Sequence, residues 1–257
     1  MNSERVAVIT GAGSGIGEAT AKCFAAAGYR VAVLDIDVAK GQAVAASLGA
    51  PHVFMAVDVA DATSVSSVAA ALSAQFGRID VLVNSGGILQ NATRVLDMDL
   101  GEAERILRIN YLGTVACCQA FGRLMKAAGQ GSIVTLASVN SYRPSAQPAY
   151  GATKTAIVSL TETLAAELGP SGVRVNAVAP GYTLTPAMQA RIDSGQRDPQ
   201  AIIGATALGC FVQPADVAEA ILFLCSDKAS VITGITLPID AGWLAMTAYK
   251  SWAAQPN

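Results

Sequence analysis

The stretch Val6-Ala-Val-Ile-Thr-Gly-Ala-Gly-Ser-Gly-Ile-Gly17 decides the fold of this 257-residue chain. A short apolar run, Arg5 to Thr10, passes through closely spaced glycines into a helical pattern over 15–28. Glycines let the backbone turn tightly there, and they bring the N–H groups and positive dipole of a helix N-terminus up to an anion. The stretch therefore predicts a strand, a turn and a helix that together bind a pyrophosphate.

The alternation of short apolar runs with helical patterns continues along most of the chain. The runs are nearly continuous in apolar character, which is typical of strands covered by helices on both faces. The further predicted strands are 30–34, 53–57, 81–84, 132–137, 174–179 and 235–239. The further predicted helices are 38–48, 62–76, 100–127, 149–169 and 214–225. This order predicts an α/β fold, a doubly wound parallel sheet of about seven strands, as a single domain over residues 1–257.

Composition limits the class of protein. The chain is 52% hydrophobic and 14% charged, with a net charge of −2. No apolar run reaches the length of a membrane span and the N-terminus has no cleavage-site pattern, so we expect a cytoplasmic protein. The charge balance argues against nucleic acid as a partner. The five cysteines are expected to be reduced core thiols, and with His52 as the only histidine no metal site is expected.

Polar or small residues stand where several predicted strands end. Asp35 closes the second strand, 18 residues beyond Gly17. A carboxylate there can accept both hydroxyl groups of an adenosine ribose and would repel a 2′-phosphate, which favours NAD over NADP. Asp58 ends the third strand, where it can bind an adenine amino group or, equally, cap the next helix. The turn that starts at Asn84 is built of small residues, so a ring can approach it closely.

Tyr150 and Lys154 are four residues apart in a predicted helix and therefore lie on one face of it. The ammonium group favours the phenolate and so lowers the pKa of the tyrosine, which makes Tyr150 a candidate general base in a chain with one histidine. Ser138 ends the fifth predicted strand and can stabilise a developing alkoxide.

In this order and spacing, the features resemble the classical short-chain dehydrogenase/reductase family, over nearly the whole chain. The resemblance implies a Rossmann-type sheet of seven parallel strands, commonly a homotetramer, and an NAD-dependent alcohol dehydrogenase. It implies that Tyr150 is the general acid/base, that Lys154 binds the nicotinamide ribose, and that Ser138 orients the substrate oxygen. Asn110 resembles the residue that holds a water beside Lys154. The implied cofactor-binding residues are Gly11, Ser14, Gly15, Ile16, Gly17, Asp35, Asp58, Val59, Asn84, Gly86, Tyr150, Lys154, Pro180, Gly181 and Thr183.

The stretch between Ser138 and Tyr150 suggests the kind of substrate. Asn140, Arg143 and Gln147 make it polar for a segment that borders the expected pocket. Together with Ser138 and Tyr150 they predict a polyol, sugar or sugar acid rather than a steroid or fatty-acyl group. Residues 180–214 form a long connection rich in Pro, Gly and Thr, and we expect them to be the lid over the substrate.

Three alternative functions for a protein with the same kind of sheet are weaker. Asp35 speaks against an NADPH-dependent carbonyl reductase such as a 3-ketoacyl reductase, and related enoyl reductases place the lysine seven residues after the tyrosine rather than four. A non-catalytic dinucleotide sensor has no need of the Tyr150 and Lys154 pair. At the C-terminus, Trp243 and Trp252 are expected to support a subunit interface.

Overall fold

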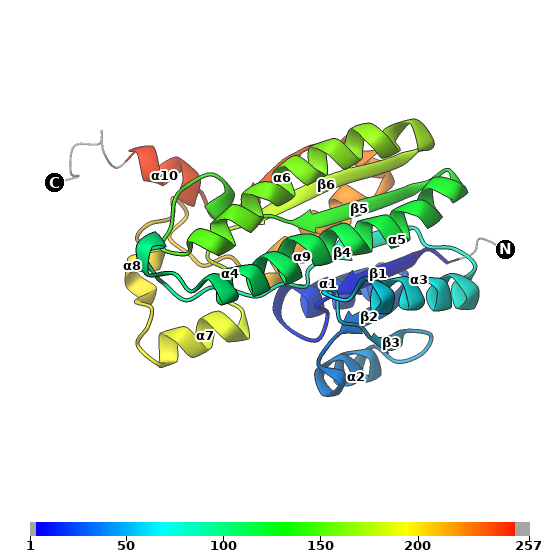
Figure 1. The fold of residues 1–257 in the computed structure, drawn as a ribbon, viewed down its shortest axis with the longest axis horizontal. Helices are drawn as coiled ribbons and strands as arrows, with labels where there is room; N and C mark the ends of the chain where they lie inside the picture. The colour runs from blue at the N-terminus through cyan, green and yellow to red at the C-terminus, as the bar shows by residue number, and fades with distance from the viewer. Residues whose placement is uncertain (1–3, 250–257) are drawn as a thin grey trace.

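A computed structural model describes residues 4–249, which form a seven-stranded sheet with helices on both faces (Figure 1). All neighbouring strands are parallel, in the order β3-β2-β1-β4-β5-β6-β7. The strands are β1 Val6–Thr10, β2 Arg30–Asp35, β3 Val53–Ala56, β4 Val81–Asn84, β5 Gly131–Leu136, β6 Val173–Pro180 and β7 Thr236–Ile239. The predicted fold class is confirmed.

The helices form two layers around a core that alternates along each strand. In β1, Val6 and Val8 pack on the face covered by α3, α5 and α6, whereas Ala7 and Ile9 pack on the face covered by α1, α2 and α9. Successive strand side chains point to opposite faces, so a strand buried on both sides must be apolar throughout. These helices are α1 Gly15–Ala26, α2 Val38–Leu48, α3 Ala62–Phe76, α5 Gly113–Ala128, α6 Pro148–Leu168 and α9 Pro214–Cys225.

The helix predicted over 100–127 is interrupted. It consists of α4, Leu100–Leu107, a π-helical turn, Arg108–Leu112, and α5. Such single π turns inside helices are rare and often found at functional sites. Asn110 lies within this turn.

Residues 180–214 contain two short helices that the sequence did not reveal, α7, Pro186–Asp193, and α8, Pro199–Ile203. Each begins with a proline, directly after a capping side chain from Thr185 or Asp198. Proline suits the first position of a helix because its missing N–H would have no partner there. Pro186 and Pro199, which suggested irregular structure, are thus helix starts.

The described chain ends with α10, Trp243–Tyr249, which lies above α8 at the left end of the molecule in Figure 1. Trp243 packs edge-on against Tyr182, with ring centroids 6.0 Å apart. Its ring thus contacts the segment predicted to be the lid of the same chain. Trp252 lies outside the described residues.

The connections reverse direction between β1 and β4, which are neighbours in the sheet. A Cβ on Gly11 would lie only 2.6 Å from the Cα of Gly86, so the turns after these two strands are in close backbone contact. Open sheets of this kind bind ligands in the crevice beyond the strand ends at such a switch point.

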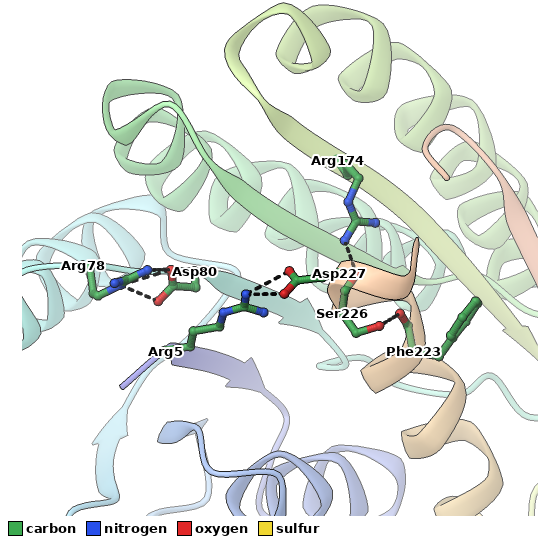
Figure 2. Close-up of polar contacts among 7 residues, drawn as sticks. All are labelled: Arg5, Arg78, Asp80, Arg174, Phe223, Ser226 and Asp227. Carbon is green, nitrogen blue, oxygen red and sulfur yellow. Dashed lines mark hydrogen bonds and ion pairs between the residues drawn. The ribbon is translucent and has the colours of Figure 1, made fainter. Parts of the chain in front are cut away.

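Charged side chains pair at the opposite end of the sheet, where the strands begin (Figure 2). Arg5 donates to both carboxylate oxygens of Asp227 at 2.8 and 2.7 Å, and Arg78 pairs with Asp80. From β6, Arg174 donates to the backbone carbonyl of Ser226 at 3.2 Å (Figure 2) and to that of Leu224, near the C-terminus of α9, at 2.6 Å. A cation at a helix C-terminus is stabilising. These residues lie where the strands begin, whereas the crevice lies beyond the strand ends.

Other predictions from composition can be compared with the described part of the chain. No helix within residues 4–249 is long and apolar enough to cross a membrane, and no metal-type cluster of His, Cys, Asp and Glu occurs among them. All five cysteines are free thiols; Cys117, Cys118 and Cys225 are buried as predicted, but Cys210 is exposed. His52 is an edge residue whose Nδ1 accepts from the N–H of Val31.

Candidate active site

A cavity of about 500 Å³ lies at the strand ends beside the switch point, within the size range of small-molecule and cofactor sites. It brings together most of the predicted site residues, although they come from six of the seven strand ends, from the start of α6 and from the lid. Those that line it are Gly11, Ser14, Gly15, Ile16, Asp35, Asp58, Val59, Gly86, Ser138, Tyr150, Lys154, Pro180, Gly181 and Thr183.

The glycine loop and Asp35 form one rigid unit at one end of the cavity. Asp35 Oδ2 accepts from the N–H of Gly13 at 2.8 Å, and its Oδ1 accepts from the N–H of Asp37 at 2.9 Å. Ser14 occupies the N-cap of α1 but its side chain makes no cap bond. The first-turn N–H groups of α1 thus have no side-chain cap within the described residues, and they face the cavity with the positive end of the helix dipole, as a pyrophosphate requires.

Lys40 is a cation near Asp35. Its Nζ pairs with Asp37 at 2.8 Å, and Lys40 does not line the cavity. The carboxylate of Asp35 lines the cavity directly, beside Ile36, whose side chain is exposed. The charge presented at this end is therefore negative.

Asp58 and Val59 line the next part of the cavity. The helix-cap alternative for Asp58 is wrong, because α3 is capped by Asp61, whose side chain accepts from Thr63. Asp58 Oδ1 instead accepts from the N–H of Ala60 at 2.9 Å. A Cβ on Gly113 would lie 2.9 Å from Val59, so α5 packs closely behind this wall.

Ser138, Tyr150 and Lys154 meet at the other end. Ser138 follows β5, and the two others lie one turn apart near the start of α6. Lys154 is buried; its Nζ donates to the carbonyl of Leu136 at 2.7 Å and lies 5.5 Å from the centre of the Tyr150 ring. A hydroxyl, a phenol and an ammonium group thus surround one point of the cavity.

Burial governs the pKa values of this group. Burial lowers the pKa of Lys154 to about 8. Burial also raises the pKa of Tyr150, and the hydrogen bond with Ser138 opposes that rise. The sequence predicted a lowered tyrosine pKa from the neighbouring ammonium group. The structure gives the opposite direction, since desolvation of the phenolate outweighs the other effects.

Asn110 lies behind the cavity rather than on its surface. Its Oδ1 accepts from the N–H of Ile88 at 2.8 Å, and its Nδ2 donates to the carbonyl of Ile88 at 2.9 Å. A Cβ on Gly87 would lie 3.2 Å from Asn110 Oδ1 and 4.0 Å from Lys154 Nζ. The π turn therefore aims Asn110 at the backbone after β4, close to the lysine.

Two residues of the predicted cofactor set also lie off the cavity surface. Gly17 supports the loop from behind, because a Cβ there would lie 2.1 Å from the carbonyl oxygen of Gly11. Asn84 is buried and its Nδ2 donates to the thiol of Cys118 on α5 at 3.3 Å. Both shape the turns without lining the cavity.

Of the five residues predicted to contact substrate, Ser138 and Tyr150 line the cavity, but Asn140, Arg143 and Gln147 do not. Gln147 is buried, with its Nε2 donating to the carbonyl of Gln90, and Asn140 Nδ2 donates to Gln147 Oε1 at 3.3 Å. Arg143 is exposed and donates to the Tyr142 carbonyl at 2.9 Å. Asn140 and Gln147 thus bond to other groups of the protein and Arg143 is exposed outside the cavity, so the inference of a polar substrate from these three residues loses its basis.

Several lining residues were missed from sequence. Arg105 and Ile109 come from α4 and the π turn, four residues apart and hence on one face. Leu89 adds to the apolar wall, as do Pro186, Ala187 and Met188 from the predicted lid. Thr185 lies over the glycine loop, since a Cβ on Gly15 would be 3.4 Å from its methyl group.

Sequence comparison places this chain among known enzymes. A family model described as enoyl-(acyl carrier protein) reductase matches residues 11–244. D-threitol dehydrogenase of Mycolicibacterium smegmatis is 41% identical over 243 residues, covering 93% of this chain and 92% of that protein. Cis-4-hydroxycyclohexanecarboxylate dehydrogenase of Sinomonas cyclohexanicum is 36% identical over 252 residues, covering 95% of this chain and 98% of that protein.

Solved structures are also similar to this chain over nearly its whole length. One described as ribose-5-phosphate isomerase from Brucella melitensis has a TM-score of 0.92 and 41% identity, covering 96% of both chains. ElxO with NADP bound has a TM-score of 0.89 and 30% identity, covering 94% of this chain and 99% of its own. With these matches, the predicted family is confirmed: the chain belongs to the short-chain dehydrogenases/reductases, oxidoreductases that bind a nicotinamide dinucleotide and act on CH–OH groups.

Proposed function

We propose that the protein interconverts a secondary alcohol and a ketone with NAD, and that Tyr150 is the general acid/base. The observation that carries this proposal is the meeting of Ser138, Tyr150 and Lys154 in the cavity that also holds the glycine loop and Asp35. A base and a hydroxyl donor at one end and an anion site at the other suit a dinucleotide with its reacting ring beside the phenol.

The residues present fit the cofactor. The first turn of α1 would hold the pyrophosphate, Asp35 the adenosine ribose, and Lys154 the second ribose. When bound, the nicotinamide ring supplies hydride acceptance or donation at the carbon of the alcohol or ketone. The turn of Ser85, Gly86 and Gly87 leaves room beside the ring position, since it carries almost no side chain.

The protein's own residues move the proton. In the oxidative direction, the Tyr150 oxygen takes the hydroxyl proton of the substrate while Ser138 donates a hydrogen bond to the same substrate oxygen. Lys154 favours the phenolate through its charge, which a pKa of about 8 leaves mostly present at neutral pH. In the reductive direction, the phenol returns the proton.

Asp35 supports NAD over NADP. A 2′-phosphate would meet the carboxylate that the Gly13 and Asp37 N–H groups hold in place, and Lys40 is already paired with Asp37. ElxO is a structural relative with NADP bound, so NADP is the alternative to be tested.

For the substrate, the relatives support a polyol or a hydroxy acid. Two of them are named for D-threitol and for a cyclic hydroxy acid. The apolar wall of Leu89, Ala187 and Met188 suits the carbon skeleton of such an alcohol, and Arg105 is a cation on the same cavity surface.

The test is a panel of polyols, sugar acids, hydroxy acids and simple secondary alcohols, each with NAD and with NADP, followed by the absorbance of the reduced cofactor. We expect turnover with NAD on a polyol or hydroxy acid. Turnover only with NADP, or only on hydrophobic alcohols, contradicts the corresponding part of the proposal.

A homotetramer in the cytoplasm completes the proposal. Leu96, Leu100, Leu107 and Leu112 are exposed along α4 and the segments beside it. Exposed apolar surface of this kind commonly marks an interface between subunits. Light scattering after size-exclusion chromatography measures the subunit number directly, and a monomer would contradict this assignment.

A further inference from the structure

Gln90 is a fully buried polar residue in the loop that follows β4. Its Oε1 accepts hydrogen bonds from the backbone N–H groups of Ala149, at 2.9 Å, and Tyr150, at 3.2 Å. These are the second and third residues of α6, where N–H groups have no partner inside the helix. Gln90 thus caps the helix that carries the cavity tyrosine.

The start of α6 lacks the usual kind of cap. A capping side chain normally belongs to the residue just before the helix and is Ser, Thr, Asp or Asn. Here that residue is Gln147, whose side chain makes no cap bond. Its Nε2 instead donates to the backbone carbonyl of Gln90. Two glutamines therefore fasten the helix start to the loop after β4.

The same network reaches Ser138. Asn140 Nδ2 donates to Gln147 Oε1 at 3.3 Å, and the N–H of Asn140 donates to Ser138 Oγ at 3.2 Å. Hydrogen bonds thus run from Ser138 through Asn140, Gln147 and Gln90 to the backbone of Tyr150. The three intermediate residues do not line the cavity.

The amide of Gln90 is retained at a cost. Its Nε2 is buried and makes no hydrogen bond with the residues that the structure describes. An unpaired buried donor typically costs about 1–3 kcal/mol. An apolar side chain of the same length would avoid that cost but would leave the N–H groups of Ala149 and Tyr150 without an acceptor. The acceptor is therefore the function of this side chain.

We propose that Gln90 is a positioning residue of the reaction, which fixes the start of α6 so that the Tyr150 and Ser138 hydroxyl groups meet one substrate oxygen. The inference rests on the proposed function and adds a residue to it. Small displacements of a reacting group are expensive, since about 1 Å can cost as much as 100-fold in rate.

Two variants of Gln90 test the proposal. Gln90→Met keeps the length and removes the acceptor, whereas Gln90→Glu keeps an acceptor whose charge is favourable at a helix N-terminus. We expect Gln90→Met to lower kcat by about tenfold or more, with KM for the nicotinamide cofactor within about twofold of wild type. Gln90→Glu should recover most of the lost kcat.

Arg174→Met is the control, because it destabilises the fold at the end of the sheet where the strands begin, opposite the cavity, and should leave kcat unchanged. If Gln90→Met does not fold, Gln147→Met removes an outer link of the network and should lower kcat about threefold. An active wild type whose kcat survives both substitutions overturns this inference alone, as does a loss that Gln90→Glu does not recover. A wild type without turnover on any alcohol overturns the proposed function.

Discussion

At the scale of single residues, the chemistry depends on one phenol. Tyr150→Phe removes the proton acceptor and leaves the ring and the glycine loop in place. We expect kcat to fall by at least about 100-fold, since general acid–base catalysis is typically worth 10²–10⁴. Cofactor affinity, measured by fluorescence titration, should stay near that of wild type. More than about a tenth of the wild-type kcat in the variant would remove Tyr150 from its role.

Asp35 is the residue on which the choice of cofactor depends. In Asp35→Ala, the carboxylate no longer repels a 2′-phosphate, and the N–H groups of Gly13 and Asp37 lose their acceptor. We expect KM for NAD to rise and the NAD-to-NADP ratio of kcat/KM to fall by about tenfold or more. An unchanged ratio, or a wild type that prefers NADP, contradicts the assignment.

Lys154 gives a prediction about stability and pH. Its pKa of about 8 in the folded protein lies below the value of 10.5 for an unburied lysine. The folded state therefore loses the proton first, so this group's contribution to stability increases as the pH rises from 8 to 10.5. In Lys154→Met that contribution is absent. Urea denaturation should show the variant losing stability relative to wild type across this window; a constant difference would contradict the lowered pKa.

At the scale of elements, the π turn between α4 and α5 links the sheet to the reacting end. Asn110→Ala leaves the N–H and carbonyl of Ile88, which are partly buried, without their side-chain partner. We expect a loss of about 2 kcal/mol in the free energy of unfolding together with a fall in kcat. Asn110→Asp keeps the acceptor, so its free energy of unfolding should lie between those of the wild type and Asn110→Ala. A stable Asn110→Ala protein would mean that water replaces the amide fully.

The elements also show where sequence was sufficient. The strands were found because their apolar runs are continuous, and the glycine loop because it follows such a run. The short helices α7 and α8 were not, because proline after Thr185 or Asp198 marks a loop and a helix start equally well. The π turn has no sequence signature of its own, so residues 100–127 looked like one helix.

In the site, the same division holds. Strand ends converge in a parallel sheet, so Asp35, Asp58 and Ser138 could be placed in one cavity from their positions alone. The side chains of Asn140, Arg143 and Gln147 could not be placed, since a polar loop residue serves a substrate or the protein's own backbone with the same atoms. Gln90 was missed because a cap from a distant loop leaves no local pattern.

At the scale of the whole molecule, the charged cluster opposite the cavity bears on stability. Arg174→Met takes a charged donor from the carbonyls of Leu224, Ser226 and Ile232. Hydrogen bonds to charged groups contribute about 1.5–3 kcal/mol, so we expect the melting temperature to fall by on the order of 5 °C. Calorimetry measures the shift, and steady-state kinetics should be unaffected. A fall in kcat would show that the strand beginnings and the cavity at the strand ends are coupled.

The separation of these two ends of the sheet also affects how the sequence of such a protein can evolve. Arg5, Arg174 and their partners anchor the strand beginnings, whereas the cavity is made of the turns and helices beyond the strand ends. Substitutions that reshape the cavity wall of Leu89 and Met188 for another alcohol leave the ion pairs and hydrogen bonds of Arg5 and Arg174 unchanged. A loss of stability from such a change can be compensated by substitutions near the strand beginnings without altering the newly acquired specificity.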